Sequence, residues 1–88
     1  MTIKIEQPDK QQLDQMGIDS WSSWGCGVET FDWKYSSEEV AYILKGKVIV
    51  STDQGDVIIQ KGDLVTFPKG LACTWKVEEP IEKVYTFR

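Results

Sequence analysis

The chain has 88 residues, with ten basic and fourteen acidic side chains and a net charge of −4. This length allows one domain, residues 1–88, and is too short for a second core. A negative surface repels phosphate backbones and anionic lipid, and no stretch approaches the roughly 18 apolar residues of a membrane span. We therefore expect neither nucleic acid nor a membrane among its partners. Because so short a chain buries a modest share of its surface, we expect it to gain stability as a homodimer.

The first residues predict an edge strand followed by a short helix. Residues 2–6 alternate polar and apolar side chains, as a strand does, and Pro8 ends it. Asp9 then caps a helix, with Gln12 completing a capping box and Gly17 as the C′ residue. A helix this short is unstable alone in water, so it must pack against the rest of the chain.

Strands and turns alternate through the remainder of the sequence. Residues 18–24 lead into a strand, and Phe31, Trp33 and Tyr35 share one side of the next, because successive side chains of a strand point to opposite faces. Further strands are predicted over 40–44, 47–51, 57–59, 64–67, 74–78 and 84–87, the last two separated by Glu79-Pro80. Many short strands at regular spacing with a single helix favour an all-β barrel or sandwich.

Two sets of spaced residues resemble the motifs of the cupin family. The first family motif is G-x5-H-x-H-x3–4-E-x6-G, and its spacing is matched by Gly27, Trp33, Tyr35, Glu39 and Gly46. The second is G-x5-P-x-G-x2-H-x3-N, and its spacing is matched by Gly62, Pro68, Gly70, Cys73 and Val77. Backbone reasons support the shared positions, since the glycines allow a positive φ or a close approach and the proline fixes φ. The resemblance implies a single cupin-type jelly-roll β-barrel with its pocket inside.

A narrower likeness comes from the flanking residues. The W-x-x-W pair at Trp21 and Trp24 and the ending EKVYTFR are similar to small single-domain cupins related to the ureidoglycine aminohydrolase cupin domain. From the residues alone, the two tryptophans are expected to pack under the short helix or to form part of a dimer surface.

The cupin resemblance also implies where metal ligands would lie. Metal-bearing cupins use three histidines and a glutamate, whereas this chain has no histidine. Glu39 keeps its usual residue and Cys73 is the only other strong donor, while a tyrosine phenol with a pKa of about 10 is a poor ligand. Two donors do not make the site that a catalytic metal needs. We predict no metal and no cofactor, with Glu39 and Cys73 as weak metal candidates only.

The predicted ligand-binding residues are Phe31, Trp33, Tyr35, Glu39, Cys73 and Trp75. The aromatic side chains could form a stacking wall for a planar ring or a sugar, or could simply fill a small barrel. Glu39 could be a general acid or base, or could hydrogen-bond its neighbours and hold the pocket in shape. Cys73 lacks the histidine that usually generates a thiolate, so a buried, mainly apolar role is the better interpretation.

Two cysteines, Cys26 and Cys73, are too few for a disulfide framework and indicate reduced thiols in a cytoplasmic protein. The N-terminus lacks the apolar core of a secretory signal peptide. The sequence leaves open whether a transit peptide has been removed.

Three functions fit the residues. The preferred one is binding of an unknown small organic molecule without a metal, and the others are a partner-binding homodimer with a filled barrel and a metal-independent acid–base enzyme that uses Glu39 with Tyr35.

Overall fold

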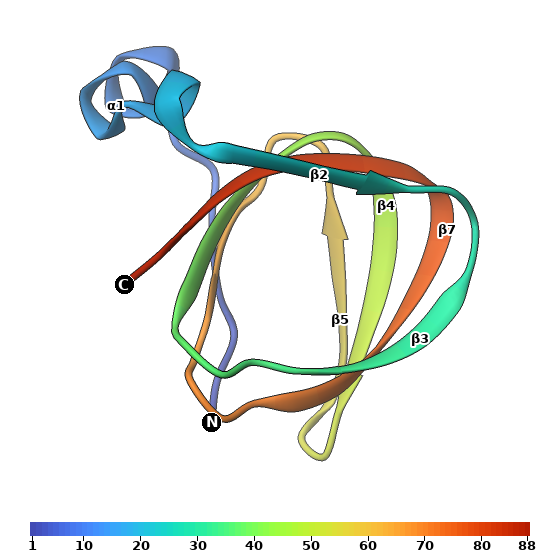
Figure 1. The fold of residues 1–88 in the computed structure, drawn as a ribbon. Helices are drawn as coiled ribbons and strands as arrows, with labels where there is room; N and C mark the ends of the chain where they lie inside the picture. Colours follow the sequence, from blue (N-terminus) through green and yellow to red (C-terminus); the bar gives the residue numbers. More distant parts are fainter.

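Strands make up most of the structure, a computed structural model that describes residues 1–88 (Figure 1). Along the chain the elements are β1 (Lys4–Glu6), α1 (Lys10–Met16), the 3-10 turn η1 (Ile18–Ser20), β2 (Ser22–Cys26), β3 (Thr30–Lys34), β4 (Glu39–Thr52), β5 (Gly55–Gln60), β6 (Leu64–Phe67) and β7 (Ala72–Phe87). The prediction of an all-β chain with one short N-terminal helix is confirmed. No helix in the structure has the length and apolar character needed to span a membrane.

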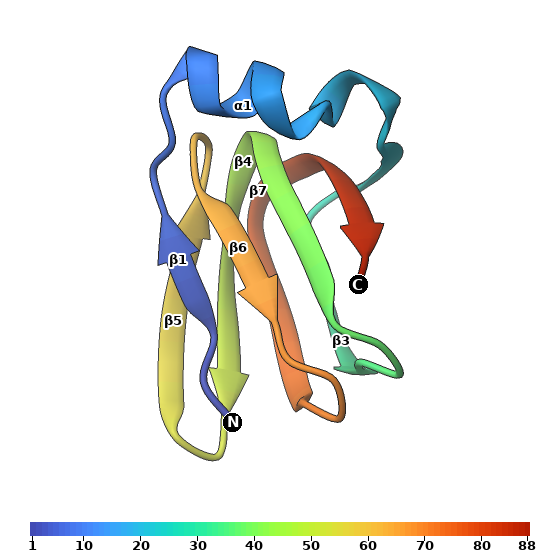
Figure 2. The ribbon, with the colours of Figure 1, turned by 90° about the vertical axis from the view of Figure 1, so that its left-hand side faces the viewer.

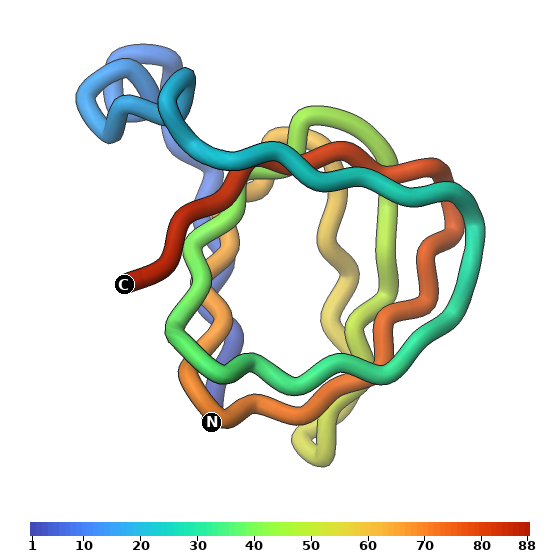
Figure 3. The backbone as a smooth tube through the Cα atoms, in the orientation of Figure 1, coloured from blue at the N-terminus to red at the C-terminus, as the bar shows by residue number.

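All the strands belong to one antiparallel sheet. Its order is β1-β6-β4-β7-β2, with β3 also paired to β7 and β5 to β4. The two longest strands each change neighbours along their length: β4 pairs first with β6 and then with β5, and β7 pairs first with β3 and then with β2. The backbone therefore curls round a common interior (Figure 3), as expected for the jelly-roll β-barrel that the resemblance implied.

The predicted break at Glu79-Pro80 is wrong, because β7 runs through it as one strand. The register between β4 and β7 shifts repeatedly between Ile43 and Val48, and Pro80 lies in this irregular stretch, where its missing N–H interrupts no regular ladder. Gly46 lies opposite. A Cβ on this glycine would stand 2.2 Å from the carbonyl oxygen of Pro80, so the two strands approach too closely for any side chain.

The N-terminal predictions are confirmed in detail. Asp9 caps α1, both hydrogen bonds of the capping box with Gln12 are present, and Gly17 closes the helix in the left-handed conformation. The helix lies outside the barrel at one end of the sheet (Figure 2), and β1 is an edge strand on β6. One implication of the cupin motif does not hold: Gly27 has neither a positive φ nor any neighbour within 4 Å of an added Cβ.

The interior divides into an aliphatic part and an aromatic part. Thirteen buried residues form the core cluster, and its aliphatic members come from β4, β5, β6, β7 and the turn after β6. Val48, Val50 and Ile59 are completely buried there. The aromatic part lies toward β2, β3 and the two ends of β7, and it leaves space between its side chains. The barrel is therefore filled on one side and hollow on the other.

Candidate functional site

The hollow part of the barrel is a pocket of about 420 Å³. Ten residues line it, seven of which are aromatic and three of which carry charge: Trp24, Phe31, Trp33, Tyr35, Trp75, Tyr85, Phe87, Glu29, Glu39 and Lys83. No aliphatic side chain contributes to the lining. A cavity of this size and composition can hold a small ligand and offers it only a few polar contacts.

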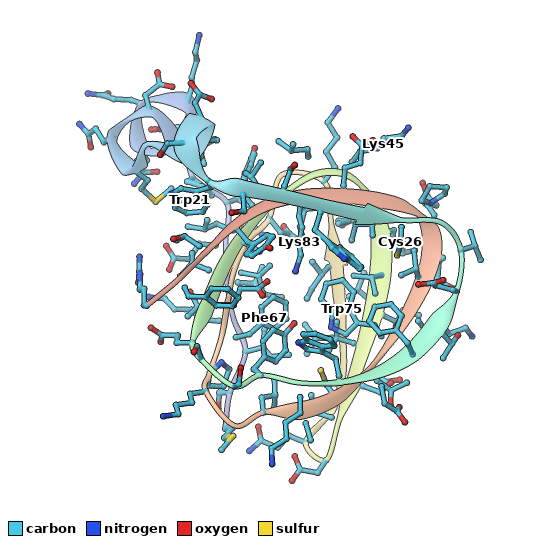
Figure 4. The ribbon with its side chains drawn as sticks, in the orientation of Figure 1. Trp21, Cys26, Lys45, Phe67, Trp75 and Lys83 are labelled. Atoms are coloured by element: carbon cyan, nitrogen blue, oxygen red, sulfur yellow. The ribbon has the colours of Figure 1, made fainter.

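An ion pair is buried among these aromatic rings. Nζ of Lys83 donates to Oε2 of Glu39 at 2.6 Å, and the two side chains are only 8% and 6% exposed. Lys83 extends from β7 toward the interior, whereas Lys45 on β4 points to solvent (Figure 4). Each partner makes burial of the other tolerable, because an unpaired charge in an apolar interior is strongly unfavourable.

Four aromatic rings surround the ammonium group of Lys83. Nζ lies 5.0 Å from the ring centroid of Trp75, 5.2 Å from Trp24, 5.3 Å from Tyr85 and 5.9 Å from Phe67. Cation–π attraction at such distances stabilises a cation, the more so where water is excluded. We call these four rings the aromatic cage; together with Glu39 they hold the positive charge at a fixed place in the pocket.

The aromatic rings also pack against one another. Tyr35 stacks on Phe67 with centroids 4.6 Å apart, and Phe31 stacks on Trp75 at 5.9 Å. Trp24 meets both Phe31 and Trp75 edge to face. Such contacts restrict the rings beyond what burial alone would do, so the rings hold one another in place along the walls of the pocket.

Two buried polar atoms at this site have no hydrogen-bond partner, Oη of Tyr35 and Nε1 of Trp75. Burial, reinforced by the charge of Glu39, raises the pKa of Tyr35 far above its ordinary value, while the Trp75 indole opposes the rise without reaching hydrogen-bond geometry. Tyr35 is therefore a neutral phenol that can donate but not a base. An unsatisfied buried donor is unfavourable. Both atoms have almost no exposed surface, so neighbouring side chains must shift before a ligand or water can accept from them.

The structure brings five of the six predicted ligand-binding residues to the pocket: Phe31, Trp33, Tyr35, Glu39 and Trp75. Cys73 does not line it. Its thiol is buried in the core cluster, 3.6 Å from the carbonyl oxygen of Trp33, and burial raises its pKa. Cys73 instead lines a separate, more open hollow beside β3 and the end of β4, together with Asp32 and Trp33.

Sequence reasoning missed five lining residues: Trp24, Glu29, Lys83, Tyr85 and Phe87. The sequence contained one signal that could have identified three of them. In the ending EKVYTFR, alternate positions place Lys83, Tyr85 and Phe87 on one face of a strand, and a lysine on an otherwise aromatic face indicates a buried cation. Trp24, expected as a packing residue, lies at the pocket mouth with 37% of its surface exposed.

The donor set does not fit the transition metal that the cupin resemblance implies. No group of three or more His, Cys, Asp or Glu side chains is placed to hold a metal ion. The carboxylate of Glu39 already has a cationic partner 2.6 Å away in Lys83, and this ammonium would repel a divalent ion bound to the same group.

Comparisons with known proteins place the chain among cupins. A DUF861 family protein from Thermotoga maritima is 48% identical, with a TM-score of 0.96 over 99% of this chain and 100% of that one. "Acetate kinase EutQ" from Clostridioides difficile (strain 630) is 29% identical in an alignment 99 positions long that covers 96% of this chain and 63% of the relative. The structure of the Clostridium difficile EutQ protein shares the fold, with 20% identity and a TM-score of 0.68 over 94% of this chain and 64% of that one.

The jelly-roll prediction is thus confirmed, while the narrower likeness to ureidoglycine aminohydrolase cupins stays a prediction. The profile of the EutQ-like cupin domain matches residues 13–85, which is most of the sequence. The chain belongs to the family of EutQ-like cupin domains.

Proposed function

We propose that this cupin binds a small organic molecule in its aromatic pocket without the help of a metal. The observation that carries the proposal is the Glu39–Lys83 ion pair, set inside a lining whose other walls are almost entirely aromatic. Pockets that bind small ligands combine a mainly apolar lining with a few placed polar groups. The volume of about 420 Å³ lies within the usual range for such sites.

The polar groups define what the ligand must offer. An ammonium group has three N–H donors, and Lys83 uses one of them on Glu39. Tyr35 and Trp75 each hold a further donor without a partner. A ligand with one or two oxygen acceptors on a flat, partly apolar body would accept from the remaining N–H groups of Lys83 and stack against the rings. The Tyr35 and Trp75 donors, which have almost no exposed surface, would be reached only after the surrounding side chains shift.

Tryptophan fluorescence provides a direct test, because Trp24, Trp33 and Trp75 line the pocket and Trp21 does not. The natively purified protein is titrated with nucleobases, hexoses and small aromatic acids, and is also examined by native mass spectrometry for a retained molecule. Saturable quenching that survives in Trp21→Phe and is lost in Phe31→Ala supports the proposal. No retained molecule and no saturable response from any compound would contradict it.

Two other functions are less well supported. A partner-binding module with a filled barrel would leave the aromatic pocket without a role. Acid–base catalysis would use Glu39 as the base and Tyr35 as a donor, since burial keeps the phenol protonated. The kinase activity named for the Clostridioides difficile relative would need a phosphate site, and one lysine beside two carboxylates, Glu29 and Glu39, does not provide it.

Homodimerisation and a cytoplasmic location are separate proposals. The small size of the domain supports the first, and two free cysteines support the second. Sedimentation equilibrium of the purified chain tests the dimer, and a single species at the monomer mass of 10.1 kDa would exclude it.

A further inference from the structure

We propose that Lys83 forms an imine with a small aldehyde or ketone bound in the aromatic pocket. This inference rests on the proposed ligand-binding function and assigns the ligand a chemical class. Lys83 is the only buried lysine of the chain, and it also lines the pocket. A lysine in a largely apolar cavity can act as a nucleophile toward a carbonyl carbon when a neighbouring group takes its proton.

Glu39 lies where that proton acceptor must be. Its Oε2 is 2.6 Å from Nζ of Lys83, within hydrogen-bond reach. Transfer of one proton from Nζ to this oxygen leaves a neutral amine and a carboxylic acid. The amine lone pair then attacks the carbonyl carbon of the ligand, and a proton moves from nitrogen to oxygen to give a carbinolamine.

The second half of the reaction returns the proton. The carboxylic acid of Glu39 protonates the hydroxyl group of the carbinolamine, which leaves as water, and the nitrogen lone pair forms the C=N bond. The products are a cationic iminium on Nζ, one water molecule and the Glu39 carboxylate. One buried pair thus supplies both the base and the acid, with no outside reagent and no change in total charge.

The aromatic cage suits the charged product as well as the starting ammonium. Trp24, Phe67, Trp75 and Tyr85 lie 5.0–5.9 Å from Nζ, and the iminium charge stays on the same nitrogen. Cation–π attraction and the regenerated carboxylate therefore stabilise it in place.

Reductive trapping tests the proposal on the full chain. The protein is incubated with acetaldehyde, benzaldehyde or pyruvate and with sodium cyanoborohydride, which converts an iminium into a stable secondary amine. Peptide mass spectrometry then measures the label at every lysine, and exposed lysines such as Lys45 and Lys61 serve as internal controls. We expect Lys83 to be labelled at least about tenfold faster than they are, and Glu39→Gln to slow its labelling about 100-fold.

The same compounds are titrated by tryptophan fluorescence, so that the two proposals fail separately. Saturable quenching with labelling of Lys83 no faster than Lys45 overturns the imine and leaves ligand binding intact. Neither quenching nor selective labelling by any of the three compounds overturns the imine. Both proposals are overturned if, in addition, no molecule is retained and the nucleobases, hexoses and aromatic acids give no saturable response. The wild-type peptide map decides the question even if Glu39→Gln does not fold.

Discussion

Removing the amine of Lys83 should destabilise the fold more than any other lysine substitution. Lys83→Met keeps a long unbranched side chain but leaves the Glu39 carboxylate buried without a partner, at 6% exposure. Breaking one side of a buried ion pair costs about 3–5 kcal/mol. Total stability for 88 residues is about 4–13 kcal/mol, so we expect the variant to lose a large share of it.

Two further variants show whether the missing partner is the cause. Replacing both residues, with Lys83→Met and Glu39→Leu together, removes the stranded charge and should recover stability to within about 1 kcal/mol of the wild type or better. The matched control is Lys47→Met. Lys47 pairs with Glu78 at 3.9 Å on the surface, where both side chains are about one-third exposed, and such pairs contribute at most about 1 kcal/mol.

Urea unfolding followed by far-ultraviolet circular dichroism measures all three variants. The midpoint and the slope give the free energy of unfolding in water, and an unchanged slope shows that the unfolded state is comparable. The reasoning is refuted if Lys83→Met loses less than about 1 kcal/mol, or if the double variant is as unstable as the single one. Either result would mean that Glu39 does not depend on Lys83.

Three more predictions concern the backbone, the phenol and the helix cap. Gly46→Ala should lower the free energy of unfolding in urea by about 3 kcal/mol or more, because its Cβ would meet the carbonyl of Pro80 at 2.2 Å and its φ is +94°. The control Gly62→Ala, with open space around the added Cβ, should lose only about 1–2 kcal/mol. Equal losses would contradict the close approach of the two strands. Burial raises the pKa of Tyr35 above its ordinary 10.0, so above about pH 10 the unfolded chain releases a proton that the folded chain keeps, and stability falls as pH rises. In urea unfolding, Tyr35→Phe should therefore show a smaller loss of stability between about pH 9 and about pH 11 than the wild type does. An unchanged pH profile would exclude the phenol as the source of the loss. Asp9→Ala should weaken α1 by about 1 kcal/mol, seen as faster amide exchange over residues 10–16, and unchanged exchange would show that the cap contributes nothing.

Local chemistry explains what the sequence predicts well. The capping box of Asp9 and Gln12, the left-handed Gly17 and the turns between strands all depend on residues within a few positions of one another. The spaced motifs extend this to the cupin barrel, because Gly46 and Gly62 recur where the backbone needs a positive φ. The positions of Phe31 and Trp33 on one wall follow from alternation along a single strand.

Features that depend on distant segments were not predictable in the same way. Glu39 and Lys83 are 44 residues apart and meet only because β4 and β7 are neighbours in the sheet. The continuity of β7 through Pro80 depends on the matching irregularity around Gly46 in β4, which no local rule specifies. Cys73 has the spacing of a ligand residue, but its thiol lies against the carbonyl oxygen of Trp33, 40 residues away in the sequence, on the paired strand β3.

Charge balance links the departures from the cupin motif into one explanation. A buried carboxylate at the position of Glu39 needs a cationic partner, and in metal-bearing cupins the resemblance assigns that role to a metal ion held with histidines. Here β7 supplies the cation on a side chain, Lys83, at 2.6 Å. Once the cation is covalently attached, the histidine positions no longer need donor atoms, and Trp33 and Tyr35 are free to line the pocket. Glu39 is then explained by its lysine partner, and a chain that lost Lys83 would have no physical reason to keep the carboxylate.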